Sequence, residues 1–156
     1  ELDYVHDNPL FELRPAEYVI NVKTISALDQ MTAINNAIAV DLSGQTTAES
    51  IGPSVKSAAG GQTAFAVGAT MAKEGRSITV LRSTAKGGTL SNIVSIFPAG
   101  TLVTLPRNVT DIVITEWGVA HLRGKTQRQR VEELIAIAHP DFRDELRREA
   151  RKLWWP

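Results

Sequence analysis

The apolar positions of this chain alternate between two spacings, which predicts strands interleaved with helices. Within residues 31–42, Ile34, Ile38, Val40 and Leu42 share one parity, which is typical of a strand with one apolar face. A turn at 43–46 then leads to an expected partner strand at 47–52, which ends at Gly52-Pro53. β-Branched and aromatic residues predict further strands at 17–22, 77–81, 90–97, 102–105 and 111–115.

Helical spacing appears in three later segments. An alanine-rich apolar run at 63–71 ends at a stop signal, where we expect Gly75 to adopt the left-handed conformation. Thr126 and Gln129 form a capping-box pattern that opens a second helix. Pro140 opens a third, whose apolar stripe ends at Ala150. Residues 116–124 are expected to be an irregular connection.

The pattern predicts an α/β domain over residues 1–156, with an open mixed sheet and covering helices. Residues 1–16 contain Pro9 and Pro15 and are expected to form a leading segment across the domain. At 156 residues the chain is long enough to bury one core, and nothing in it suggests a second domain.

Composition excludes several classes of function. Seventeen basic residues balance seventeen acidic ones, so no charge excess favours nucleic acid or an anionic membrane as a partner. The chain has no cysteine, which excludes disulfides, thiolate metal sites and a cysteine nucleophile. With no apolar run of membrane-spanning length and no signal pattern, a cytoplasmic protein is expected. Because the chain begins at Glu1, we expect a piece of a longer protein.

Gly60 and Gly61 carry the first candidate chemistry. Two glycines before an apolar helix leave backbone N–H groups able to face an anion or a polarised carbonyl, although a simple tight turn has the same pattern. No metal site is expected, because His121 and His139 lack acidic neighbours at ligand spacing and are interpreted as structural. Ser83 and Ser91 lack the nucleophile-elbow pattern of serine hydrolases.

Six stretches together resemble the C-terminal half of the acetyl-CoA hydrolase/transferase family, which includes the 4-hydroxybutyrate, butyrate and succinate:acetate CoA-transferases. They follow the family's order and spacing from about residue 18 to the end, and they are 31–45, 49–52, 60–62, 83–88, 115–125 and 136–143. The resemblance implies the open α/β fold shared by CoA-transferases and sugar-phosphate isomerases. It also implies coenzyme A as a substrate rather than a permanent cofactor.

In this family a glutamate carboxylate attacks the acyl-CoA thioester to give a mixed anhydride, and CoA then returns to form a glutamyl thioester. A carboxylic acid or water resolves that thioester, which divides one difficult transfer into easier steps. The resemblance places this nucleophile in the half that precedes Glu1. The isolated chain is therefore expected to be inactive, with the N-terminal half of the same enzyme as its partner and a homo-oligomer as its assembly.

The resemblance assigns roles to individual residues of this chain. Asn35 matches the asparagine that orients the acyl carbonyl or the glutamate, and Gly60 and Gly61 match the backbone donors to the tetrahedral oxygen. Lys86, in a glycine-rich loop, is a candidate for a CoA phosphate. Glu116 is an alternative nucleophile, because a Glu-x-Gly pattern marks the catalytic glutamate in another branch, but a turn cap or a pair with Arg123 is the structural interpretation.

The chain departs from the family pattern at Ala58, where a glycine is usual, and at Ala64 and Val67, where an aspartate and an arginine are usual. These changes imply either that the substrate-binding end of the site differs from that of other family members or that the activity is weakened. Glu49 is interpreted as a structural carboxylate. Two other functions remain open: a stand-alone, non-catalytic acyl-CoA-binding or scaffold module, and a sugar-phosphate-binding relative that uses the Gly60 loop.

The C-terminal end carries two further expectations. Residues 143–152 are interpreted as the solvated face of an amphipathic helix. Trp154 and Trp155 are expected to dock on the body or on a neighbouring subunit, because exposed paired tryptophans are unusual in a monomer.

Overall fold

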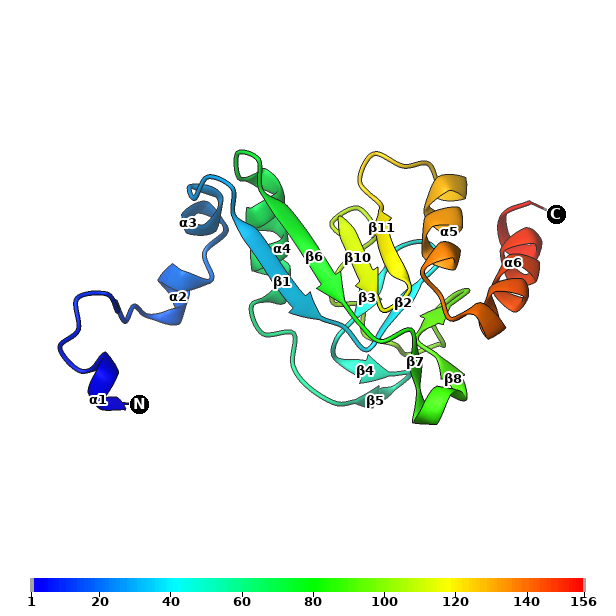
Figure 1. The fold of residues 1–156 in the computed structure, drawn as a ribbon, viewed down its shortest axis with the longest axis horizontal. Helices are drawn as coiled ribbons and strands as arrows, with labels where there is room; N and C mark the ends of the chain where they lie inside the picture. Colours follow the sequence, from blue (N-terminus) through cyan, green and yellow to red (C-terminus); the bar gives the residue numbers. More distant parts are fainter. Residues whose placement is uncertain (1, 156) are drawn as a thin grey trace.

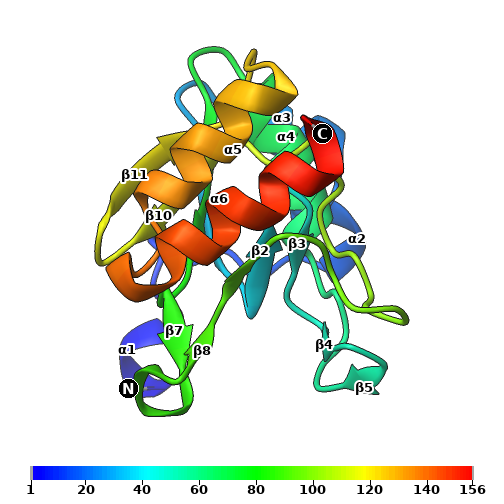
Figure 2. The same cartoon turned by 90° about the vertical axis from the view of Figure 1, so that its right-hand side faces the viewer.

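The structure, a computed structural model, describes residues 2–155 and consists of a four-stranded sheet, a three-stranded sheet and two hairpins, with the longer helices packed against the sheets (Figure 1, Figure 2). The helices are α1 (Leu2–Val5), α2 (Ala16–Val19), α3 (Val22–Ser26), α4 (Gln62–Met71), α5 (Gln127–Ala136) and α6 (Pro140–Trp154), with a 3-10 turn η1 (Lys86–Gly88). The strands are β1 (Thr32–Asn36), β2 (Ala39–Asp41), β3 (Thr46–Thr47), β4 (Ser50–Ile51), β5 (Ser54–Val55), β6 (Arg76–Val80), β7 (Thr84–Ala85), β8 (Leu90–Ser91), β9 (Ile93–Val94), β10 (Ile112–Thr115) and β11 (Gly118–His121).

The main sheet has the order β1-β6-β10-β11. The strands β1, β6 and β10 run parallel, and β11 returns antiparallel to β10. A second sheet has the order β3-β2-β9, and the hairpins β4-β5 and β7-β8 stand apart from both. The core contains residues of β2, β9, β10, β11, α5 and α6, with Val40, Ile93, Val113 and Leu134 fully buried.

Local signals confirm several predicted elements. Thr126 accepts a hydrogen bond from the Gln129 backbone N–H while the Gln129 side chain returns one to Thr126, so the capping box opens α5 as expected. Pro140 is the first residue of α6, and the predicted helix at 63–71 is α4. The predicted strands at 77–81 and 111–115 are β6 and β10.

The strand predicted at 31–42 is wrong, because the segment is two strands in two different sheets. The Ala37 N–H donates to the Val80 carbonyl at 3.0 Å, which continues the pairing with β6. The next N–H, that of Ile38, donates to the Thr47 carbonyl at 2.8 Å, which starts the pairing with β3. The change of partner also changes the buried face: Ala33 is buried, whereas Ile34 is 65% exposed.

The strand predicted at 17–22 is also wrong, since this segment forms α2 and α3. Pro15 occupies the N-cap of α2, and the Asn21 side chain accepts from the Lys23 N–H to open α3. Ile25 of α3 then packs on α4 and is buried. In this segment the helix caps and the packing of Ile25 on α4 outweigh the preference of β-branched residues for strands.

The connection predicted to be irregular at 116–124 contains β11. Gly118, with φ of 142°, ends a two-residue turn at Glu116-Trp117, so β11 folds back on β10 as a hairpin. The strands predicted at 90–97 and 102–105 shrink to β8, β9 and a single bridge between Thr46 and Leu105. The predicted partner strand at 47–52 is divided, because β3 pairs with β2 whereas β4 pairs with β5.

Glu74, with φ of 56°, takes the left-handed position predicted for Gly75. Gly75 serves close packing instead, because a Cβ there would lie 2.1 Å from the Ala69 carbonyl oxygen.

Candidate functional site

The carboxyl ends of the parallel strands form one edge of the main sheet, at which ligands of open α/β sheets usually bind (Figure 1). A cleft of about 580 Å³ lies at this edge. It is lined by Asn36, Ala37, Val80, Leu81, Arg82, Ile114, Thr115 and Glu116. The hairpins β4-β5 and β7-β8 extend below the same edge in Figure 1.

Gly60 and Gly61 lie directly before α4, whose first turn starts at Gln62. Gly60 is exposed with φ of 55°, in the left-handed region, and a Cβ there would meet nothing within 4 Å. Gly61 is the N-cap of α4, and no side chain caps the helix there. Within residues 2–155 the N–H groups of both glycines lack a protein acceptor, so they are free to donate to a ligand.

Gln62, the first residue of α4, has a buried side-chain amide nitrogen with no hydrogen-bond partner in the described part of the chain. The residue is 7% exposed. A buried amide donor without an acceptor costs stability, so such a group is often retained for a function.

Asn35 is half-buried on β1 opposite Thr79 of β6. By strand alternation it shares the face of Ala33, which is the face that α4 covers. Asn36, one residue later, lines the cleft on the other face. Asn35 and Glu116 are therefore not brought into one cleft by the folded chain.

Both carboxylate oxygens of Glu116 accept from Ser83, which is fully buried. The Ser83 hydroxyl donates to Oε1 at 2.5 Å, and the Ser83 backbone N–H donates to Oε2 at 2.9 Å. The Ser83 hydroxyl contributes most to lowering the pKa of Glu116, against a smaller effect of burial that raises it. Glu116 joins the end of β10 to the chain after β6, and no ion pair links it to Arg123 within the described residues.

Lys86 lies in η1 at the tip of the β7-β8 hairpin, exposed to solvent. It adopts φ of 49°, and its carbonyl accepts from the Thr89 hydroxyl at 2.9 Å. The Glu49 carboxylate accepts from the Thr104 hydroxyl at 2.8 Å, which agrees with the structural role expected for it.

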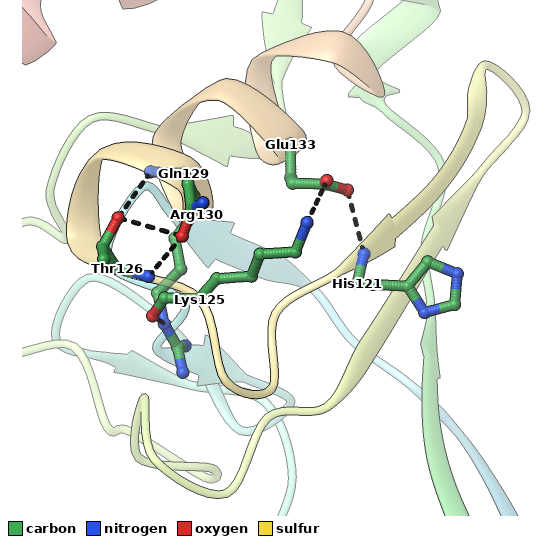
Figure 3. A network of polar contacts seen from close by, with 6 residues as sticks. All are labelled: His121, Lys125, Thr126, Gln129, Arg130 and Glu133. Atoms are coloured by element: carbon green, nitrogen blue, oxygen red, sulfur yellow. Dashed lines mark hydrogen bonds and ion pairs between the residues drawn. The ribbon is translucent and has the colours of Figure 1, made fainter.

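A separate polar network joins β11 to α5 and has a structural role (Figure 3). Glu133 accepts from the Lys125 ammonium at 3.0 Å and from the His121 backbone N–H at 3.1 Å. The hydrogen bond from Lys125 is the main reason that the pKa of Glu133 lies below its usual value. Arg130, buried beside it, donates to the Arg107 carbonyl at 2.7 Å, and burial lowers the pKa of its guanidinium.

The described residues contain no group of three or more His, Cys, Asp or Glu side chains that could hold a metal ion. None of the helices in residues 2–155 has the length and apolar character needed to cross a membrane.

The sequence pattern did not assign roles to Gln62 and Asn36. Gln62 stands inside the stretch 60–62 on which the resemblance depends, and Asn36 follows Asn35 at the strand end. Both asparagines lie in β1, where alternation puts successive residues on opposite faces, but the structure alone shows that α4 covers the face of Asn35.

The comparisons with known proteins all point to the same family. A family described as acetyl-CoA hydrolase/transferase C-terminal domain matches residues 2–150. The 4-hydroxybutyrate coenzyme A transferase of Clostridium kluyveri is 45% identical over 150 residues, which are 96% of this chain and 35% of that protein. The probable butyrate:acetyl-CoA coenzyme A-transferase of Syntrophomonas wolfei is 44% identical over 153 residues, which are 97% of this chain and 34% of that protein.

Solved structures agree with these relatives. The crystal structure of RipA from Yersinia pestis has a TM-score of 0.87 at 36% identity, covering 97% of this chain and 33% of its own. The 4-hydroxybutyrate CoA-transferase from Porphyromonas gingivalis has a TM-score of 0.79 at 42% identity, covering 97% of this chain and 34% of its own. They confirm the predicted open α/β fold. The chain spans about a third of the length of the curated relatives it matches.

Proposed function

Because this chain belongs to the acetyl-CoA hydrolase/transferase family as its C-terminal domain, we propose that it supplies CoA and carbonyl recognition to an enzyme that transfers CoA between acids or hydrolyses acyl-CoA. The observation that carries this proposal is the start of α4. There, two glycine N–H groups without a protein acceptor precede the buried, unpartnered amide of Gln62.

In the proposed mechanism, Gly60 and Gly61 donate hydrogen bonds to the oxygen that becomes negative when the thioester carbonyl is attacked. Such donors act where charge develops, and removing one commonly raises the barrier by about 2.7–4 kcal/mol. The macrodipole of α4 adds to this stabilisation because its positive end points to the same place. Asn35, half-buried on the α4 side of the sheet, is proposed to orient the acyl carbonyl or the attacking carboxylate.

The nucleophile is proposed to be a glutamate in the part of the enzyme that precedes this chain. Glu116 fits a positioning role better, because both of its oxygens already accept hydrogen bonds from Ser83. These bonds favour its ionised form and occupy one lone pair on each oxygen, which makes the carboxylate a weaker nucleophile toward a thioester.

The remaining parts of the proposal concern ligands and assembly. Coenzyme A is a substrate, with a carboxylic acid or water as acceptor, and Lys86 on its exposed hairpin tip is the candidate for a CoA phosphate. The proposed enzyme is a cytoplasmic homo-oligomer. Light scattering on the purified enzyme and cell fractionation would test these two points.

The test is a titration of acetyl-CoA and of free CoA into the 156-residue chain by calorimetry, together with a thioester-cleavage assay. The matched variants are Gly60→Val and Gly124→Val, because both glycines have positive φ and open space around the missing Cβ. Binding that only Gly60→Val abolishes, without turnover, supports the proposal. Turnover by the isolated chain contradicts it and points to Glu116 or Glu49 as nucleophile.

A further inference from the structure

The helices α5 and α6 lie side by side at the surface (Figure 2), and a groove of about 480 Å³ lies between them. Its lining comes from residues 128–136 of α5 and from residues 147–155 at the end of the chain, and we name it the α5–α6 groove. Pockets that hold small molecules have volumes of about 300–1,000 Å³, so the groove is large enough for one.

The groove lies toward the opposite end of α6 from the carboxyl edge of the main sheet. His139, directly before α6, packs edge-to-face on Trp117 in the turn after β10, with the ring centroids 5.3 Å apart. The 15 residues of α6 then extend over about 22 Å before Trp155. Among the described residues, the groove and the cleft at the carboxyl edge have no lining residue in common. The groove is therefore a separate candidate site.

The floor of the groove is apolar but leaves little surface free. Val131 and Ile135 of α5 and Ala150 of α6 are 2%, 4% and 1% exposed, because they pack into the core. A partner helix would find little apolar area to cover there, whereas standard protein interfaces bury about 800 Å² on each partner. A small ligand that is held by polar and aromatic groups fits this groove better.

The rim of the groove is positively charged. The guanidinium groups of Arg128, Arg147 and Arg151 stand against one carboxylate, that of Glu132, among the described lining residues. Arg128 pairs with Glu132 at 3.3 Å and Arg147 with Asp144 at 2.8 Å, but these side chains are mostly exposed, so the pairs are weak. Arg151 has no ion pair within residues 2–155. The excess of positive charge favours an anionic ligand.

Trp155 gives the groove an aromatic wall. The ring packs on the body of the domain, which is one of the two positions expected for it, and the residue is half-buried. The guanidinium of Arg128 lies over this ring, with its Cζ atom 5.8 Å from the ring centroid. Indole and guanidinium groups both stack on planar aromatic rings. The exposed part of Trp155 therefore favours a ligand that carries such a ring.

We propose that the α5–α6 groove binds a small aromatic phosphate, the chemistry of a nucleoside monophosphate. Its ring lies against Trp155, and its phosphate accepts hydrogen bonds from Arg147 and Arg151. A phosphate monoester carries about two negative charges at neutral pH, which matches three guanidinium groups against one carboxylate. Guanidinium groups also bind phosphate through paired hydrogen bonds. This inference does not depend on the proposed function, because the groove is separate from the carboxyl edge and from the start of α4.

The test is a calorimetric titration of AMP, adenosine and inorganic phosphate into the 156-residue chain. Arg151→Gln removes one guanidinium from the groove. Arg148→Gln is the matched control, because Arg148 is also exposed on α6 without an ion pair in the described chain but does not line the groove. Trp155→Leu removes the aromatic wall, and Trp155→Phe keeps an aromatic ring there.

Coenzyme A also contains an adenosine phosphate, so a free nucleotide and coenzyme A are two sources of the same chemistry. The two are distinguished by competition in the Gly60→Val variant, in which the proposed site before α4 is altered. Displacement of AMP by coenzyme A assigns the groove to the adenosine phosphate of that molecule. AMP that coenzyme A does not displace assigns the groove to a free nucleotide.

We expect AMP to bind the natural chain, and we expect Arg151→Gln to weaken this binding at least about tenfold, as for a lost hydrogen bond between charged groups. Arg148→Gln should have little effect. Adenosine and phosphate should each bind at least about tenfold more weakly than AMP, because each makes only part of the contacts. Trp155→Leu should weaken AMP binding, and Trp155→Phe should retain most of it.

Three results would overturn the proposal. The first is a natural chain that does not bind AMP, and the second is an equal loss of binding in Arg151→Gln and Arg148→Gln. The third is phosphate that binds as tightly as AMP, which would mean that the arginines attract any anion. Sedimentation of the same samples is the further check, since a dimer that Arg151→Gln dissociates would overturn the proposal in favour of a second copy in the groove.

Discussion

At the scale of single residues, the start of α4 contains a group that lowers stability without an evident structural gain. The Gln62 amide is buried and unpartnered in the described chain. We expect Gln62→Leu to leave the free energy of unfolding unchanged or to raise it by up to about 1 kcal/mol, because an unsatisfied donor is removed. In the full enzyme, the same change should weaken CoA binding.

Urea unfolding measures the change in the free energy of unfolding, and calorimetry measures the change in CoA binding. Thr63→Val is the control in the same helical turn, since the Thr63 hydroxyl donates to the Thr104 carbonyl at 2.8 Å and its loss should cost about 1 kcal/mol. A loss of more than 1 kcal/mol for Gln62→Leu would mean that this amide has a partner in solution.

The Ser83 hydroxyl contributes to stability at the edge of the main sheet where the parallel strands end. It is fully buried and donates to the Glu116 carboxylate. We expect Ser83→Ala to lower the free energy of unfolding by about 1–3 kcal/mol, as for hydrogen bonds to charged groups. Glu116→Gln in the Ser83→Ala background should add little, because the two residues form one unit. Fully additive losses in chemical denaturation would rule out this coupling.

At the scale of secondary-structure elements, Gly68 sets the distance between α3 and α4. A Cβ at this position would lie 2.6 Å from the Cβ of Ile25. We therefore expect Gly68→Ala to destabilise the chain by about 1–3 kcal/mol, although alanine is the better helix former. Thermal unfolding of Gly68→Ala, Ile25→Ala and the double variant checks this. The double variant should lose less than the sum of the single losses, and a stabilising Gly68→Ala would disprove the close contact.

The stability of the contact between β11 and α5 should depend on pH, because Glu133 accepts hydrogen bonds there. The pKa of its carboxyl is lowered in the folded chain, mainly by the hydrogen bond from Lys125. A lowered folded-state pKa means that the stabilisation is present above the unfolded-state pKa and is lost as pH falls through the folded-state value. We expect Glu133→Gln to remove this part of the acid destabilisation.

The measurement is Tm as a function of pH for the natural chain, Glu133→Gln and Glu132→Gln. Glu132 pairs with Arg128 on the same helix at 65% side-chain exposure, so its replacement should change little. Identical acid limbs for all three proteins would contradict a role of Glu133 in the pH dependence.

At the scale of the whole molecule, the leading arm, residues 3–15, lies apart from the folded body (Figure 1). We expect a chain without residues 1–15 to keep its Tm within about 2 °C, because the arm buries little surface on the body. Removal of residues 1–30 should instead destabilise the body strongly, since α3 and its buried Ile25 are lost. A large loss of Tm for the shorter truncation would show that the arm packs on the body in solution.

Elements specified by neighbouring residues were predictable from the sequence. The capping box of α5, Pro140 at the start of α6 and the apolar run of α4 each depend on contacts within one or two helical turns. The glycine pair before α4 is readable for the same reason, since a bare backbone at a helix start needs no distant partner.

Only the tertiary structure decided what depends on distant partners. The division of 31–42 into β1 and β2 follows from a change of pairing partner, from Val80 to Thr47, that no local pattern encodes. The fold likewise decides that α4 covers the face of Asn35 and that Asn36 lines the cleft on the other face. The sequence by itself determined the helices α4, α5 and α6, the family and the glycine pair before α4, because these depend on residues close along the chain. The sheet order and the choice of the buried face of each strand come from long-range packing, which local patterns do not encode.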